Sequence, residues 1–209
     1  RSTLFPYTTL FRSASDLYTD RIVAEYTGRM AFADDNFEMV RLLCLFYNAR
    51  CLYESNKKGI FAYFQKMQCT HLLADTPEYL RDKQMVKYSS FGSNAKGVNA
   101  TAAINNYANG LIRDWLLKPV STIVVDDDGE REVMVSNLYF LRGRALLEEL
   151  IAFDPVRNFD RIRALGMLML YREEKVILYG ARLNAEDSEK ADKSYLGYDD
   201  YFSRNYSEE

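Results

Sequence analysis

The chain is poor in the residues that build metal sites, disulfide frameworks and catalytic triads from imidazole or sulfur. It has one histidine, His71, and three cysteines, none of them in a C-x-x-C pair. A zinc finger and a histidine-dependent triad are therefore excluded. An odd number of unpaired cysteines argues for a reducing compartment. Any metal chemistry must rest on carboxylates, which favours Mg²⁺ or Mn²⁺.

Glycine, proline and long apolar runs are also scarce. Ten glycines and four prolines exclude a collagen or linker composition. The longest apolar runs, Leu42–Phe46 and Met167–Tyr171, fall far short of a membrane span, so no membrane partner is expected. A hydrophobic content of 48% is enough for a packed core and excludes intrinsic disorder. The net charge of −3 leaves room only for local basic patches.

The first residues, Arg1–Ser13, match none of the patterning that follows them. They contain neither the apolar core nor the cleavage site of a signal peptide. Ser2–Ser13 resembles the in-frame translation of a common sequencing adapter, so residues 1–13 are treated as an artefactual segment. The alternative is a genuine β-prone arm. On the first interpretation, the chain is a fragment whose authentic upstream sequence is missing.

Apolar residues further along the chain alternate between strand and helix periodicities. The spacing Asp35-x-x-Glu38 predicts a capping box at a helix start. Residues 184–209 carry eight acidic and three basic side chains, which predicts an acidic C-terminal tail. The alternation predicts an α/β fold. The predicted elements are a strand over Asp20–Tyr26, a helix over Asn36–Ala49, a buried strand over Cys51–Tyr53, a helix capped by Asn99 or Thr101, a hairpin through residues 123–135, and helices over residues 137–151 and 160–173.

Two acidic residues stand where α/β folds place functional groups. Glu54 directly follows the predicted buried strand, at its carboxyl end. Asp160 opens a helix that is otherwise largely apolar. Both have a structural alternative, because an acid at a helix start interacts favourably with the helix dipole without any further role. Periodicity alone leaves both interpretations open.

The clearest loop has the G-x-x-x-x-G spacing of a phosphate loop at Gly92–Gly97. Val98 and Asn99 stand where that motif needs Lys and Ser or Thr, so a nucleotide site is rejected. Residues 57–96 nevertheless contain seven basic side chains against three acidic ones. Such a segment suits contacts to a nucleic-acid backbone, or it is an ordinary solvated face. The candidate DNA-binding residues are Lys57, Lys58, Lys83, Lys87 and Lys96.

Several stretches together resemble the C-terminal nuclease domain of the large terminase subunit of tailed bacteriophages, most of all the crAss-like type. The resemblance covers about residues 15–183. Its most specific parts are an E-x-N-x-x-G stretch beginning at Glu54 and an N-x-D-x-x-x-A-L stretch containing Asp160. The matching stretches are Glu25–Arg29, Phe32–Phe64, Leu72–Gln84, Gly92–Thr101, Arg113–Val120 and Asn158–Glu174.

That resemblance implies an RNase H-like mixed sheet flanked by helices and cleavage of concatemeric double-stranded viral DNA. It implies an acid cluster holding two Mg²⁺ or Mn²⁺ ions, which activate a water and stabilise the leaving oxygen. Glu54 matches the family's strand-borne glutamate and Asp160 its late aspartate, so both are expected to be catalytic metal ligands. The family's first strand and first aspartate would precede Ser15. Residues 14–183 are therefore expected to be a truncated nuclease domain with little or no cleavage activity.

The resemblance also implies partners and a location. The expected partners are double-stranded viral DNA, the portal protein and the small terminase subunit, in the cytoplasm of the infected host. No Walker A motif is present to bind a nucleotide. Two alternatives stay open: a non-catalytic DNA-binding or portal-docking module, and another RNase H-like nuclease of the resolvase or transposase type.

Overall fold

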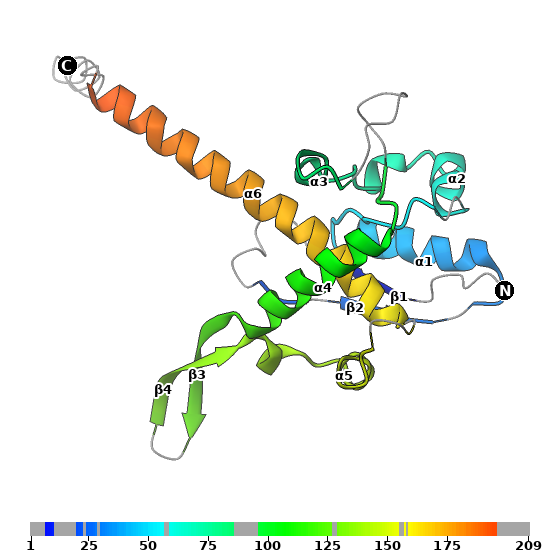
Figure 1. Ribbon diagram of the computed structural model, residues 1–209, viewed down its shortest axis with the longest axis horizontal. Helices are drawn as coiled ribbons and strands as arrows, with labels where there is room; N and C mark the ends of the chain where they lie inside the picture. Colours follow the sequence, from blue (N-terminus) through cyan, green and yellow to red (C-terminus); the bar gives the residue numbers. More distant parts are fainter. Residues whose placement is uncertain are drawn as a thin grey trace, which may run out of the picture. The chain divides into compact units, whose positions relative to one another are not determined.

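The computed structural model describes residues 7–10, 20–22, 24–28, 30–56, 59–85, 96–126, 129–154, 157 and 159–195 (Figure 1). No described helix is long and apolar enough to cross a membrane. In chain order the elements are β1 (Tyr7–Leu10), β2 (Ala24–Thr27), α1 (Ala33–Phe46), α2 (Gly59–Lys66), the 3₁₀ turn η2 (Thr70–Leu72), α3 (Glu78–Asp82), α4 (Ala102–Leu117), β3 (Pro119–Asp126), β4 (Gly129–Ser136), the 3₁₀ turn η3 (Asn137–Phe140), α5 (Arg144–Ile151) and α6 (Asp160–Tyr195).

The described strands form two separate antiparallel pairs, β1–β2 and β3–β4. β3 and β4 make the predicted hairpin, in register from Pro119 opposite Ser136 to Asp126 opposite Gly129. β1 lies within the segment that we treated as artefactual, and its pairing with β2 uses backbone groups. The predicted mixed α/β class is confirmed. Instead of one mixed sheet, the described residues show parallel contacts only as the isolated bridges Cys51–Leu73 and Glu54–Val98.

The helix over Asn36–Ala49 is confirmed in kind, but it begins three residues earlier, after Phe32. The predicted capping box is wrong, because no side chain caps this helix from the residue before it. Asn36, which lies within the helix, instead bonds to backbone groups at and before its N-terminus. Its side-chain amide donates to the Phe32 carbonyl at 3.2 Å, and its side-chain oxygen accepts from the Met30 N–H at 3.2 Å. At α4 the prediction holds, since Thr101 Oγ1 accepts from the Ile104 N–H.

The predicted helix over residues 137–151 is divided in the structure. A 3₁₀ turn at Asn137–Phe140 comes first, and α5 begins only after Gly143. The last core helix starts at Asp160 as predicted and buries Ile162, Leu165, Leu168 and Met169. It continues through Tyr195, so the first part of the segment expected to be an acidic tail is helical.

The core consists of three clusters of buried side chains. The first lies under α1 and α2 and includes Cys44, Tyr53 and Phe64. The second joins α4, α5 and α6 around Trp115 and Leu165. The third contains Leu52, Ala74, Leu80, Val98, Ile104, Ala108, Met167 and Leu170, so it connects the central loops to α4 and α6.

The helices α4 and α6 pack closely where Gly166 faces Ala108 (Figure 1). A Cβ added at Gly166 would lie 3.2 Å from the Ala108 Cβ, so the glycine permits this approach. The chain divides into two compact units, residues 1–172 and 173–209. All three core clusters belong to the first unit, which also contains both predicted site residues.

Candidate active site

Glu54 ends a buried segment that pairs with two other stretches of the chain, and these two stretches also bond to each other. Cys51 forms a parallel bridge with Leu73, and Glu54 forms a parallel bridge with Val98. In the first pairing, the Cys51 N–H donates to the Leu72 carbonyl at 2.8 Å and the Cys51 carbonyl accepts from the Ala74 N–H at 2.9 Å. The predicted buried strand Cys51–Tyr53 is thus a buried segment with an isolated bridge at Cys51 and another at Glu54, which follows it, and it is not a regular strand.

The neighbouring segment fixes the peptide groups on both sides of Glu54. The Tyr53 carbonyl accepts from the Val98 N–H at 2.8 Å, and the Ser55 N–H donates to the Val98 carbonyl at 2.9 Å. Glu54 is only 9% exposed. A carboxylate loses favourable hydration when it is buried, and Glu54 does make contacts within the fold at this position.

The structure gives a reason for Gly97, the second glycine of the G-x-x-x-x-G spacing. Its φ of +74° and the approach of the Tyr53 carbonyl exclude a side chain, since an added Cβ would lie 2.6 Å from that oxygen. The hydroxyl of Thr76 donates to the Gly97 carbonyl at 2.6 Å, and the Gly97 N–H donates to Ala74 at 3.0 Å. Gly97 therefore serves close packing beside Glu54, while Gly92 lies outside the described residues.

Asp160 is the first residue of α6 and is partly buried. The following residue anchors this end of the helix. The Arg161 N–H donates to Glu149 Oε2 at 3.0 Å, and its guanidinium Nη1 lies 2.5 Å from Glu149 Oε1. Arg161 Nε is also 3.6 Å from Glu25 Oε1. These contacts join the start of α6 to α5 and β2, so the position of Asp160 is set by tertiary ion pairs.

Glu54 and Asp160 are associated with different turns of α6. Glu54 bridges to Val98, and Val98 shares a buried cluster with Met167. Asp160 precedes Met167 by seven residues, or about 10 Å along the helix axis. Among the described residues, no group of three or more His, Cys, Asp or Glu side chains is arranged to hold a metal ion. Glu54 and Asp160 thus supply carboxylates, but the described part of the chain does not complete a two-metal site.

The basic residues predicted to bind DNA have different settings. Lys96 is held in the fold, with its Nζ 2.8 Å from Asp75 Oδ1 and 3.0 Å from the Leu73 carbonyl. Lys83 lies over the Tyr107 ring, 4.8 Å from its centroid. Lys57, Lys58 and Lys87 fall outside the described residues. The charge of Lys96 is therefore largely used within the protein, next to the segment that carries Glu54.

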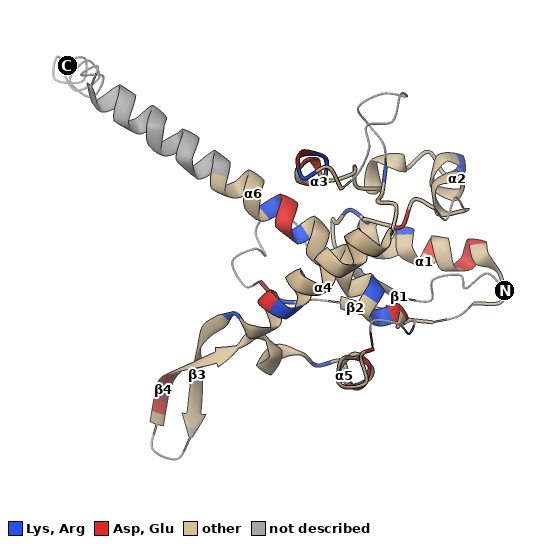
Figure 2. Cartoon of the chain, in the orientation of Figure 1, with Lys and Arg blue, Asp and Glu red and all other residues tan. Residues whose placement is uncertain are grey.

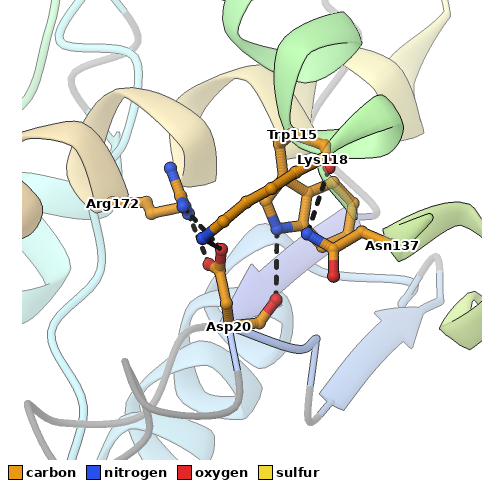
Figure 3. A network of polar contacts seen from close by, with 5 residues as sticks. All are labelled: Asp20, Trp115, Lys118, Asn137 and Arg172. Carbon is orange, nitrogen blue, oxygen red and sulfur yellow. Dashed lines mark hydrogen bonds and ion pairs between the residues drawn. The ribbon is translucent and has the colours of Figure 1, made fainter. Parts of the chain in front are cut away.

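A buried polar network that sequence analysis did not anticipate lies elsewhere in the first unit (Figure 3). Asp20 has a side chain that is 8% exposed and accepts two hydrogen bonds from Arg172, at 2.5 and 2.6 Å. Lys118 donates to the same carboxylate at 2.9 Å, and the Trp115 indole N–H donates to the Asp20 carbonyl at 3.1 Å. The partners are about 100 and 150 residues away in sequence, so no short-range sequence pattern predicts these contacts.

The charges around Asp20 settle its protonation state. Burial raises the pKa of this carboxyl, but the hydrogen bonds and charges of Arg172 and Lys118 outweigh burial and lower the pKa below its ordinary value. Asp20 is therefore ionised at neutral pH and fully engaged. Its contacts tie α4 to α6 and to the residues ahead of β2, which gives it a structural role.

The three cysteines are poor candidates for a nucleophile. All are free and buried. Burial raises the pKa of the Cys44 thiol to about 12 and also raises the pKa of Cys51 and Cys69. Because the thiolate is the reactive form, these side chains are inert packing residues at neutral pH.

Sequence analysis also overlooked two arginines near Asp160. Arg157 precedes it by three residues and is exposed, and Arg163 follows it by three residues and is partly exposed. The available signal was the spacing R-x-x-D-x-x-R around the candidate metal ligand. Comparison with protein-family models, with curated proteins and with solved structures finds no match to this chain.

Proposed function

We propose that residues 14–183 belong to a nuclease domain of the terminase type, a class whose RNase H-like core cleaves double-stranded DNA using divalent metal ions. In this proposal Glu54 and Asp160 are metal ligands. A further acid, on the family's first strand, would complete the site. The proposal follows from the ordered stretches of resemblance, and the placement of the two acids supports it.

The observation that carries the proposal is the setting of Glu54. It is a buried carboxylate at the carboxyl end of a segment that forms two parallel bridges with other parts of the chain. This is the edge at which α/β folds place functional groups. Asp160 lies at the start of a helix whose buried face packs into the same core cluster as Leu52 and Val98.

The chemistry follows from the residue types. Carboxylate oxygens are the ligands that Mg²⁺ and Mn²⁺ prefer. A bound metal would polarise the phosphate and lower the pKa of a coordinated water. Glu54 would hold its ligand atoms steady through the hydrogen bonds that fix its backbone, and Asp160 through the ion pairs of Arg161.

Metal binding tests the proposal directly. We expect Glu54→Gln and Asp160→Asn each to lower Mn²⁺ affinity at least about tenfold, or about 1.4 kcal/mol. The electron paramagnetic resonance signal of free Mn²⁺ measures this. The matched control is Glu148→Gln, an exposed acid paired with Arg144 on α5. Wild-type affinity in both variants, or no Mn²⁺ binding by the wild type, would contradict the proposal.

A second candidate is a DNA-binding module without catalysis of its own. It is favoured by the absence, among the residues that the structure describes, of a three-ligand acid group. This candidate predicts duplex binding in EDTA that Glu54→Gln does not change, together with no Mn²⁺ binding. The two candidates therefore differ in whether the buried carboxylate has a cation to bind.

A further inference from the structure

Asp160 lies among arginines that differ in whether an acidic side chain neutralises them. Three arginines lie within three residues of it, at positions 157, 161 and 163. The middle one, Arg161, is neutralised by Glu149 and Glu25 and fixes the helix to its neighbours. Basic residues are visible on the first turns of α6 in Figure 2.

The outer two arginines are in a different state. Arg163 lies on the same side of α6 as Asp160, because residues three apart are neighbours on a helix surface. Arg157 belongs to the turn before α6, where its backbone N–H donates to the Asp154 carbonyl at 3.0 Å. Within the described residues, neither guanidinium has an ion pair or a side-chain hydrogen bond.

Several other arginines among the described residues do have an acidic partner. Arg41 pairs with Glu38, Arg113 with Asp114, Arg144 with Glu148, and Arg172 with Asp20. The first and last of these are mostly buried, and the other two are largely exposed. Pairing therefore occurs in both environments, while Arg50 and Arg142 are exposed and, within the described residues, also show no ion pair. What distinguishes Arg157 and Arg163 is their position on either side of Asp160.

We propose that Arg157 and Arg163 bind phosphate groups of duplex DNA on either side of Asp160. A guanidinium presents a planar fork of donors that matches phosphate oxygens, and it stays charged at every physiological pH. Two such groups flanking a metal-ligating carboxylate would hold the backbone at the metal. This inference rests on the proposed function, because it takes Asp160 to be a metal ligand.

The salt dependence of DNA binding tests the inference. The affinity of a fluorescein-labelled duplex is measured by anisotropy over a series of salt concentrations, in EDTA so that metal ligation plays no part. Each phosphate contact contributes about 0.9 to the slope of log affinity against log salt. We expect the double variant R157Q/R163Q to lower that slope by up to about 1.8. Arg113→Gln is the matched control, because Arg113 is exposed and paired with Asp114.

Three outcomes would overturn the inference. They are an unchanged slope in R157Q/R163Q, an equal loss in Arg113→Gln, and no duplex binding by the wild type at low salt. Circular dichroism and Trp115 emission show whether each variant is folded. Since the slope is measured without metal, its result is independent of the Mn²⁺ experiment on Glu54 and Asp160. Failure of the proposed function and failure of this inference are thus separate results.

Discussion

At the scale of single residues, Asp20 is the centre of a buried ionic network. Its carboxylate is buried and receives three charged hydrogen bonds, two from Arg172 and one from Lys118 (Figure 3). Removing one partner of a buried ion pair is costly, because the other charge stays buried without compensation. The network therefore holds α4 and α6 in place more through the penalty for breaking it than through its net energy.

This network makes a prediction about stability. Asp20→Asn should lower the free energy of unfolding by about 3 kcal/mol at pH 7, because Arg172 keeps a mostly buried charge without its counter-ion. Urea unfolding followed by Trp115 emission measures the change. The control, Asp114→Asn, removes an exposed partner of Arg113 and should cost no more than about 0.5 kcal/mol.

The same variant should show a defined pH dependence. The pKa of Asp20 is lower in the folded state than its ordinary value of 3.8. The stability contributed by its charge is therefore fully present above about pH 5. It is lost as the pH falls through the folded-state pKa. The difference between wild type and Asp20→Asn should shrink at pH 3 and below, and an equal difference at pH 7 and pH 3 would contradict this assignment.

At the scale of elements, the segment that carries Glu54 depends on a glycine that the sequence only hinted at. The spacing of Gly92 and Gly97 suggested a phosphate loop, which the residues after it excluded. The structure gives Gly97 a packing reason, since a side chain there would strike the Tyr53 carbonyl. Val98 bonds to the segment that carries Glu54, while Lys96 and Gly97 bond to residues 73–76.

Two glycine substitutions with opposite expected signs test this account. Gly97→Ala should destabilise the protein by at least about 1 kcal/mol, from its positive φ and the collision with Tyr53. Gly110→Ala is the matched control. It lies within α4 with open space around its Cα, so it should stabilise by up to about 1 kcal/mol. Urea unfolding measures both, and equal effects of the two would contradict the packing role of Gly97.

Elements with a strong local signal were predictable. The hairpin of β3 and β4, the Thr101 cap of α4 and the start of α6 all follow from short-range patterns. The division of the predicted helix over residues 137–151 did not follow from such a pattern, because it is associated with a tertiary contact. Gly143 leaves room for the Glu25 carboxylate, which an added Cβ would strike, and Glu25 in turn contacts Arg161.

At the scale of the whole molecule, the sequence predicted the α/β class and the burial of the segment before Glu54. It did not predict that β1 and β2 would form a sheet separate from the segment that carries Glu54. That segment pairs only through isolated bridges, which leave no distinct pattern in the sequence. The Asp20 network was also out of reach, since its partners are brought together only by the packing of α4 and α6. Glu54 and Asp160 were singled out by their positions in the predicted elements, and the resemblance then assigned them as metal ligands.

The central proposal is that Glu54 and Asp160 belong to one divalent-metal site, and iron-mediated cleavage of the backbone tests it most directly. Fe²⁺ replaces Mn²⁺ at carboxylate sites, and with ascorbate and peroxide it cuts the peptide chain next to where it is bound. We predict cuts near both residue 54 and residue 160, competed by Mn²⁺ and all lost in Glu54→Gln. Cuts near only one of the two acids, or cuts near residue 160 that persist in Glu54→Gln, would contradict a shared site.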